Sequence, residues 1–164
     1  LRHAAGMVFC HHNAPIHRLT KLARDLAEQA KRGDGRDHNR FAYEVLESFD
    51  HIGSDFESYR QTRCVQPLKA NEESDLKSLV LDAKEIEFLQ DQAQRLREKL
   101  PRRKLHDVVE SLLTPSVKRA AAINDLKGRL RTADVSESQL LELEQRLGNE
   151  VCWLHLHNLW DYIV

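Results

Sequence analysis

The segment from Ala4 to Ala30 constrains the fold of this chain most, because a short apolar run is followed at once by an amphipathic helix. Residues 4–10, AAGMVFC, are small and apolar with little alternation, which is typical of a strand buried on both faces. Asn13 can cap the helix, and Pro15 suits its first turn. Apolar residues then recur at three- and four-residue spacing and predict one continuous apolar face: Ile16, Leu19, Leu22, Ala23, Leu26, Ala27 and Ala30.

A basic turn and a second strand follow this helix. Lys31 lies in the last helical turn, where cations are favoured, and Gly33 supplies the stop. Residues 41–46, FAYEVL, predict a strand in which alternate residues share one face, namely Phe41, Tyr43 and Val45. A strand, a helix and a strand in this order predict a βαβ-like or a ferredoxin-like half.

From Glu73 onward the sequence predicts helices almost throughout. An apolar residue recurs every seven positions up to the break expected at Pro101: Leu79, Ile86, Ala93 and Leu100. Shorter helices are expected at 104–113 and 116–130, separated at Pro115.

A final helical region is signalled by Ser136 and Gln139, whose spacing is that of a capping box. Gly148 is expected to interrupt it before the apolar stretch 151–164, VCWLHLHNLWDYIV, which is hydrophobic enough to be buried. The whole pattern predicts an α+β protein, with a strand–helix–strand domain in residues 1–60 and a helical bundle of about four helices in residues 61–164.

Composition limits the classes of function. The net charge of -1 excludes a globally basic nucleic-acid binder but leaves local basic patches open. The three cysteines, Cys10, Cys64 and Cys152, are far apart, which favours reduced thiols in the cytoplasm over a disulfide scaffold or a cysteine-rich zinc site. No apolar run approaches the roughly 20 residues of a membrane span. Because a strand begins almost at Leu1, which is not methionine, we expect the chain to be the C-terminal part of a longer protein.

The first 60 residues carry a family resemblance. AAGMVFCHHNAP, an alanine-rich helix and GRDHNRFAYEVLESFDHIG resemble the end of the cyclase-type palm domain in the large subunit of type III CRISPR effector complexes. That family commonly shows a strand of the form Ser-Ala-Gly, a His-His-Lys-x-Pro segment, a long helix and a strand near Gly-Arg-Asn. This chain departs from it at Ala4, which stands in the place of serine, and at Asn13-Ala14, where lysine is frequent.

The resemblance implies a function in antiviral defence. The family's palm is related to the GGDEF nucleotide cyclases and polymerises ATP into cyclic oligoadenylate when the complex binds target RNA. Its two divalent metals, Mg²⁺ or Mn²⁺, are held by acidic residues, mainly a Gly-Gly-Asp-Asp hairpin. No such hairpin occurs in this sequence, so the chain alone is expected to be inactive. The resemblance further implies that the chain docks on other effector subunits and on guide and target RNA.

Lys31 and Arg36 are the nucleotide-binding candidates. In GGDEF-type cyclases a lysine at the end of this helix and an arginine in the next turn hold the triphosphate, and the resemblance assigns those roles to these two residues. An ammonium and a bidentate guanidinium both suit phosphate oxygens. The turn is about one residue longer here, and the alternative for Lys31 is a simple cation at a helix C-terminus.

A second basic cluster surrounds the break at Pro101. Such clusters contact phosphate backbones without reading sequence, so these residues are the candidate RNA contacts. The alternative is a solvated corner of the helical bundle. The cluster consists of Arg95, Arg97, Lys99, Arg102, Arg103 and Lys104.

The remaining histidines and aromatic residues favour structural roles. The doublet His106-Asp107 matches the two-residue core of an HD nuclease motif, but no further spaced histidines support it. His155 and His157 would point about 200° apart on a helix, which disfavours a shared metal. His11 and His12 follow a strand and would likewise point to opposite faces. Three aromatic side chains close the chain as core anchors or as a docking patch, Trp153, Trp160 and Tyr162.

Two other functions stay open from the sequence. One is a remnant of a GGDEF-type diguanylate cyclase with a helical module, against which the long helical tail speaks. The other is a non-enzymatic helical interaction protein. A strand–helix–strand unit in one sheet over residues 1–50 separates the palm hypotheses from a bundle that is helical from Leu1 onward.

Overall fold

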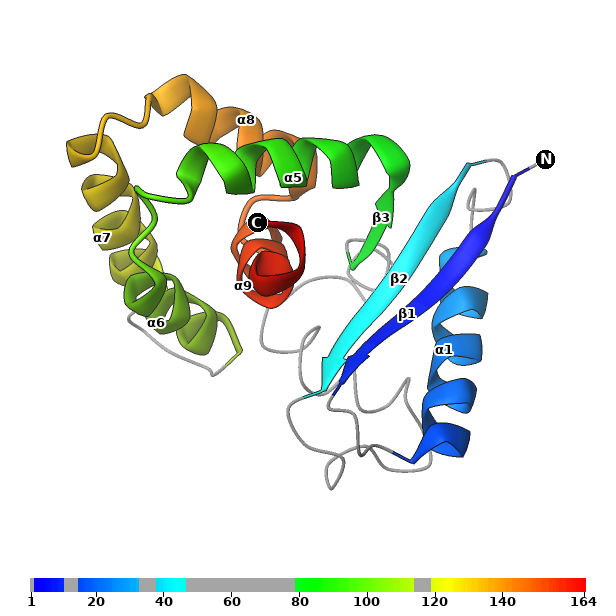
Figure 1. The fold of residues 1–164 in the computed structure, drawn as a ribbon. Helices are drawn as coiled ribbons and strands as arrows, with labels where there is room; N and C mark the ends of the chain where they lie inside the picture. The colour runs from blue at the N-terminus through cyan, green and yellow to red at the C-terminus, as the bar shows by residue number, and fades with distance from the viewer. Residues whose placement is uncertain (1, 11–14, 33–37, 47–78, 114–118) are drawn as a thin grey trace. The chain divides into compact units, whose positions relative to one another are not determined.

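The structure is a computed structural model that describes residues 2–10, 15–32, 38–46, 79–113 and 119–164. The chain divides into two compact units, Leu1–Ile86 and Glu87–Val164, so the long helix α5 (Ala83–Leu96) starts in the first unit and continues into the second. The predicted domain boundary near residue 60 lies outside the described residues. The α+β prediction, a strand–helix–strand start followed by helices, is confirmed (Figure 1).

The first unit is built on a parallel pair of strands joined by one helix. Strand β1 (Ala4–Cys10) and strand β2 (Arg40–Leu46) pair directly, in a register that runs from Ala4 opposite Arg40 to Cys10 opposite Leu46. Helix α1 (Ile16–Ala30) makes the crossover that parallel neighbours require. Of the two forms expected from the sequence, the strands adopt the βαβ form, in which they are neighbours.

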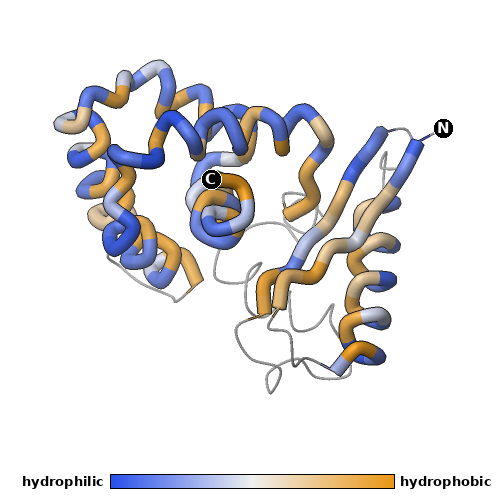
Figure 2. Tube along the Cα trace, viewed as in Figure 1, coloured by the Kyte–Doolittle hydropathy of each residue, from blue (hydrophilic) through white to orange (hydrophobic). Residues whose placement is uncertain are grey.

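Helix α1 covers one face of these strands, and its apolar stripe forms the core there. Leu22, Leu26 and Ala30 from the helix pack with Ala42 and Leu46 from β2. Figure 2 shows hydrophobic residues along both strands and at intervals along α1. Alternate residues of β1 complete this core, because successive side chains of a strand point to opposite faces: Ala4, Val8 and Cys10.

Gly6 lies where α1 approaches β1 most closely. A Cβ atom at this position would fall 1.9 Å from the backbone oxygen of Ala23 and 2.7 Å from the backbone nitrogen of Ala27. The helix therefore packs backbone against backbone at this point, which only glycine permits. On the opposite face the expectation of burial was wrong, since Met7 is 45% exposed.

The sequence missed a third strand. Strand β3 (Val80–Asp82) pairs antiparallel with β2, with Leu81 opposite Phe41, and gives the sheet order β1-β2-β3. The prediction of a continuous helix from Glu73 to Leu100 was therefore wrong at Val80–Asp82 and after Leu96. The seven-residue spacing failed because Leu79 and Leu81 are buried beside the sheet instead of on a helical seam.

A reciprocal cap explains why α5 begins at Ala83. The backbone N–H of Glu85 donates to Oδ1 of Asp82 at 2.8 Å, and the backbone N–H of Asp82 donates to Oε2 of Glu85 at 2.7 Å. These two bonds form a capping box with aspartate in the first position. The signal is present in the sequence as Asp82 followed by Glu85, but the apolar periodicity obscured it.

The second unit consists of helices in the part of the chain that the structure describes. After α5 come α6 (Arg102–Leu113), α7 (Arg119–Thr132), α8 (Glu137–Leu147) and α9 (Val151–Ile163). The predicted separation of α6 and α7 at Pro115 lies outside the described residues. Helix α6 starts before the predicted residue 104, because the Pro101 carbonyl already accepts the N–H groups of Lys104 and Leu105 at 2.8 and 3.1 Å.

The predicted end of the chain is confirmed. Oγ of Ser136 accepts the backbone N–H of Gln139 at 3.2 Å and caps α8, as the spacing indicated. Gly148 ends α8 with a φ of 90°, a left-handed value that favours glycine. Helix α9 then runs through the apolar stretch that the sequence marked for burial.

Helix α9 provides the largest part of the second unit's core. Its first six residues, Val151–Leu156, are all buried, which is expected of a helix that is hydrophobic on most sides. It packs against α6 and α8, and α6 packs against α7. Its buried residues are Val151, Cys152, Trp153, Leu154, His155, Leu156, Leu159 and Trp160.

Candidate functional site

Lys31 lies directly after α1, at the end that the sequence marked. It is the C-cap residue of the helix, and its side chain is 42% exposed. Its Nζ lies 2.5 Å from Oε1 of Glu28, one turn back along the helix. The ammonium is thus presented to solvent with a carboxylate partner, so a phosphate ligand would have to compete with Glu28 for it.

Arg36, the other residue of the proposed triphosphate site, belongs to the segment 33–37, which lies outside the described residues. His11 and His12, for which the sequence favoured structural roles, lie outside them too, in the segment 11–14. The first described residues on the far side of the turn are held to β1, because the backbone N–H of His3 donates to Oδ1 of Asn39 at 2.9 Å. The backbone N–H of Arg40 likewise donates to the carbonyl oxygen of His3 at 3.0 Å.

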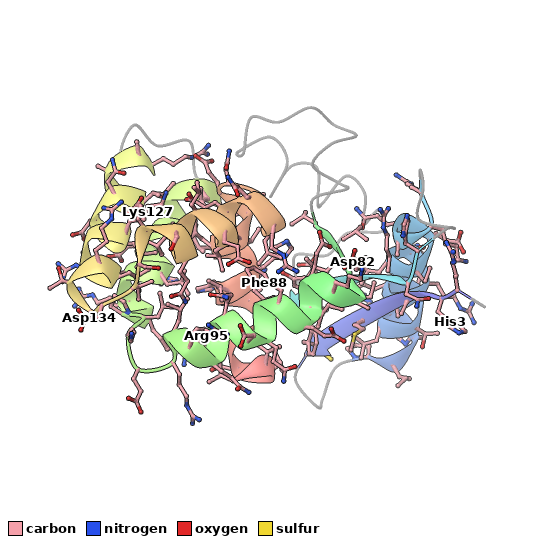
Figure 3. All side chains as sticks on the ribbon, turned by 90° about the horizontal axis from the view of Figure 1, so that it is seen from above. His3, Asp82, Phe88, Arg95, Lys127 and Asp134 are labelled. Carbon is pink, nitrogen blue, oxygen red and sulfur yellow. The ribbon has the colours of Figure 1, made fainter. Side chains whose placement is uncertain are left out.

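Most cations of the cluster around Pro101 are engaged within the second unit. Arg95 Nε lies 2.8 Å from Oδ2 of Asp91 on the same helix, and the side chain is 64% exposed (Figure 3). Lys99 Nζ donates to the carbonyl oxygen of Asp134 at 3.2 Å. Arg102 Nη2 on α6 lies 3.0 Å from Oδ2 of Asp161 on α9.

Lys104 is the most extensively paired cation of that cluster. Its Nζ lies 3.2 Å from Oδ2 of Asp125 on α7 and 3.4 Å from Oδ2 of Asp107 on its own helix. The hydrogen bond from Lys104 is the main reason that the pKa of Asp125 is lowered, and Arg129 adds to it. Asp125 therefore stays ionised and neutralises much of the positive charge at this position.

Arg97 and Arg103 differ from the rest of the cluster. Both side chains are exposed, and neither forms an ion pair with any residue that the structure describes. A cation without a carboxylate partner keeps its full charge for an external phosphate, whereas a paired one must first be released. The six-residue RNA prediction therefore has two strongest members, Arg97 and Arg103.

The helices α6 and α9 bring two histidines together that the sequence did not connect. Nδ1 of His106 lies 3.3 Å from Nε2 of His157, and the ring centroids are 5.5 Å apart. Asp107, the second residue of the HD doublet, pairs with Lys104 instead. No sequence signal links residues 51 positions apart on separate helices, so only the packing of α6 on α9 reveals the pair.

The neighbouring histidine has a different environment. His155 is completely buried, whereas His157 lies at the surface of α9, which confirms that the two point in different directions. Trp153 and Trp160 are also buried, at 0% and 6% exposure, and so act as core anchors. Tyr162 is 52% exposed and is the aromatic residue of the three that is available at the surface.

Cys152 is a buried thiol in the same helix. Burial is the main cause that raises its pKa well above the ordinary value, and the carboxylate of Glu144 adds to the effect. Its Sγ donates to the carbonyl oxygen of Asn149 at 3.1 Å. A thiol in this state is a poor nucleophile and a poor metal ligand, so Cys152 has a packing role.

The described ranges contain neither a metal-ligand group nor a membrane-spanning helix. Among those residues no set of three or more His, Cys, Asp or Glu side chains is arranged to hold a metal ion. Over the same ranges, no helix combines the length and apolar character needed to cross a bilayer.

Comparison of this chain with models of known protein families, with curated proteins and with solved structures found no match.

Proposed function

We propose that this chain is the C-terminal part of the large subunit of a type III CRISPR effector complex. In that role its first unit closes the palm that makes cyclic oligoadenylate from ATP. Its helical unit serves as a docking surface for other subunits and for guide or target RNA. A Gly-Gly-Asp-Asp hairpin, with its divalent metals, would supply the catalytic carboxylates from another part of the protein.

One observation supports this proposal: Ala4–Cys10, Ile16–Ala30 and Arg40–Leu46, which carry the described part of the resemblance, form a parallel βαβ unit in one sheet. The alternative of a bundle that is helical from Leu1 onward required the opposite. The glycine of the Ala-Ala-Gly strand has a matching physical task, because Gly6 lets α1 approach the sheet backbone to backbone. The small residues of that motif therefore fit the geometry of the unit that the resemblance implies.

Lys31 is the residue of this unit that we assign to the nucleotide. A lysine at the C-terminal end of α1 carries a compact charge at the surface, where phosphate oxygens can reach it. Glu28 holds that ammonium in the absence of ligand. An incoming triphosphate carries more negative charge than one carboxylate, so it should displace Glu28 and gain the electrostatic contact.

The helical unit adds a weaker candidate surface for RNA. Arg97 precedes and Arg103 follows the helix break at Pro101, and both keep exposed guanidinium groups. Contacts of this kind bind the phosphate backbone and weaken as salt rises. Among the paired members of the cluster, Lys104 joins α6 to α7 through Asp125, and Arg102 joins α6 to α9 through Asp161.

The test is cyclic oligoadenylate synthesis by the complete effector complex, with Lys31→Ala, Arg36→Ala and the control Arg18→Ala, an exposed cation on the same helix. We expect the first two variants to raise the KM for ATP about tenfold, equivalent to about 1.4 kcal/mol, because each loses a charged contact to phosphate. Binding of target RNA should stay unchanged. Equal KM values in all variants would remove the nucleotide role.

A separate observation tests the parent protein itself. The reading frame that contains this chain should encode a Gly-Gly-Asp-Asp hairpin some tens of residues before Leu1. If it encodes none, the palm assignment fails and the chain is better explained as a helical interaction protein. This result is independent of the KM measurement, because it concerns the catalytic carboxylates and not Lys31.

A further inference from the structure

The contact between His106 and His157 joins two helices through ring nitrogens. His106 projects from α6 and His157 from α9, and the pair Arg102–Asp161 lies one turn further along both helices. Residue numbers rise along α6 as they fall along α9, so the helices run antiparallel here. The two imidazoles therefore lie one helical turn away from the Arg102–Asp161 ion pair, along the same contact between α6 and α9.

The tautomer of His157 is set by its neighbour. Nδ1 of His157 lies 3.3 Å from Oδ1 of Asn158, an oxygen that can only accept a hydrogen bond. The proton of the neutral imidazole therefore belongs on Nδ1, and Nε2 accepts a hydrogen bond from Nδ1–H of His106. A metal ion would take the place of that proton, which moves to Nε2 of His106 or to solvent. A second hydrogen bond of this kind is the usual support for a histidine that binds a metal.

The separation of the two facing nitrogens matches a shared metal ion. Nitrogen ligands lie about 2.0–2.1 Å from Zn²⁺, so two of them in tetrahedral geometry lie about 3.3–3.4 Å apart. The observed separation of His106 Nδ1 and His157 Nε2 is 3.3 Å. The rings are tilted by 32° with their centroids 5.5 Å apart, and His106 is exposed, so rotation of its ring about χ2 can direct Nδ1 to an ion on Nε2 of His157 while the contact with Asn158 is kept.

The surroundings limit what such a site can hold. Asp161 is paired with Arg102, and Asp107 is paired with Lys104, so the nearby carboxylates are engaged by cations. In the described part of the chain no third protein ligand completes a set of three. Water would therefore fill the remaining positions, which predicts modest affinity and an ion that imidazole prefers over oxygen ligands.

We propose that His106 and His157 form a bidentate surface site for a borderline divalent cation such as Zn²⁺, which links α6 to α9. The inference does not depend on the proposed function. Since the two ligands come from separate helices, bound metal should also stabilise the folded second unit by mass action.

The experiment is titration of the full chain with ZnCl₂ at neutral pH, followed by calorimetry and by long-range ¹H–¹⁵N spectra of the imidazole rings. We expect the ¹⁵N shifts of Nδ1 of His106 and Nε2 of His157 to change together on addition of Zn²⁺. MgCl₂ should change neither, because Mg²⁺ prefers oxygen ligands. Absence of a change at these two nitrogens with Zn²⁺ would overturn the proposal.

Variants give a second, independent measurement. His106→Gln and His157→Gln should each weaken this Zn²⁺ binding at least tenfold, whereas His17→Gln, an exposed histidine on α1, should leave it unchanged. Circular dichroism checks that each variant keeps its helices. If His106→Gln and His157→Gln both bind Zn²⁺ as the wild type does, the ion binds at another position and the proposed site does not exist. If a variant loses its helices, the ¹⁵N shifts of the wild type decide the question.

Discussion

The two units of the molecule reach a packed state by different means. In the first, a single helix lies so close to the strands that one position, Gly6, must have no side chain. In the second, large side chains fill the interior, with Trp153 and several leucines completely buried around α9. One unit therefore depends on a close backbone approach and the other on buried volume. We therefore expect a methyl group added at the closest approach of the first unit to cost more folding free energy than a methyl group added to a helix of the second unit.

The units also differ in where the ion-pair partners of their cations lie. Lys31 in the first unit has one exposed carboxylate partner from its own helix. In the second unit, cations pair across helices, as Lys104 does with Asp125 and Lys127 does with Glu144 at 2.5 Å. Charges that hold helices together are less available for a ligand. Lys31 nevertheless has a carboxylate partner as well, whereas Arg97 and Arg103 of the second unit form no ion pair with any described residue.

The largest expected effect concerns Gly6, where α1 approaches β1 most closely. Gly6→Ala should destabilise the first unit by more than about 4 kcal/mol, because its new Cβ would overlap the backbone of α1 at Ala23. Gly128→Ala in α7 is the matched control, since its added Cβ would meet no atom within 4 Å apart from its chain neighbours and the backbone of its own helix, and it should stabilise by about 0.5–1 kcal/mol.

Urea unfolding monitored by hydrogen exchange measures both glycine variants, since exchange reports each unit separately. Similar small effects for Gly6→Ala and Gly128→Ala would show that α1 does not approach the sheet as closely as the structure has it.

An intermediate effect tests whether the units unfold separately. Leu26 and Leu126 are both completely buried, one in each unit. Leu26→Ala and Leu126→Ala should each cost about 2–5 kcal/mol, with the lost transfer energy and the new cavity as the cause. We expect protection from hydrogen exchange to fall only in the unit that carries the substitution. A loss of protection in both units from either variant would show that they unfold together.

The smallest effect concerns an exposed ion pair of the second unit. Arg131 donates two hydrogen bonds to Glu137, and this contact is the main cause that lowers the pKa of the Glu137 carboxyl. A carboxyl whose pKa is lower in the folded state adds stability at neutral pH. That stability is lost as the pH falls through the folded-state value.

Glu137→Gln should therefore be slightly less stable than the wild type at pH 7, and the two should converge below about pH 4. Urea unfolding from pH 7 to pH 3 measures the difference, with Glu98→Gln as an exposed control that has no ion pair among the described residues. A difference that is independent of pH would rule out the ionised carboxyl as its cause.

Local patterns in the sequence determined most of the elements. The strand at Ala4–Cys10, the cap at Ser136 and the stop at Gly148 are confirmed, because each depends on residues that are near one another in the chain. The apolar stripe of α1 is confirmed from Leu19 onward, but its first residue, Ile16, is 78% exposed. The α+β class followed from the order of these elements. The resemblance to the palm also came from contiguous residues and stays a prediction.

Only the tertiary structure decided what depends on residues far apart. Strand β3 was missed because a three-residue strand has too little periodicity to outweigh a helical pattern, and it forms only where β2 offers a free edge. The ion pairs of the basic cluster and the His106–His157 contact were invisible for the same reason, since their partners lie on separate helices. Sequence spacing fixes which residues share a face, but packing alone decides which faces meet.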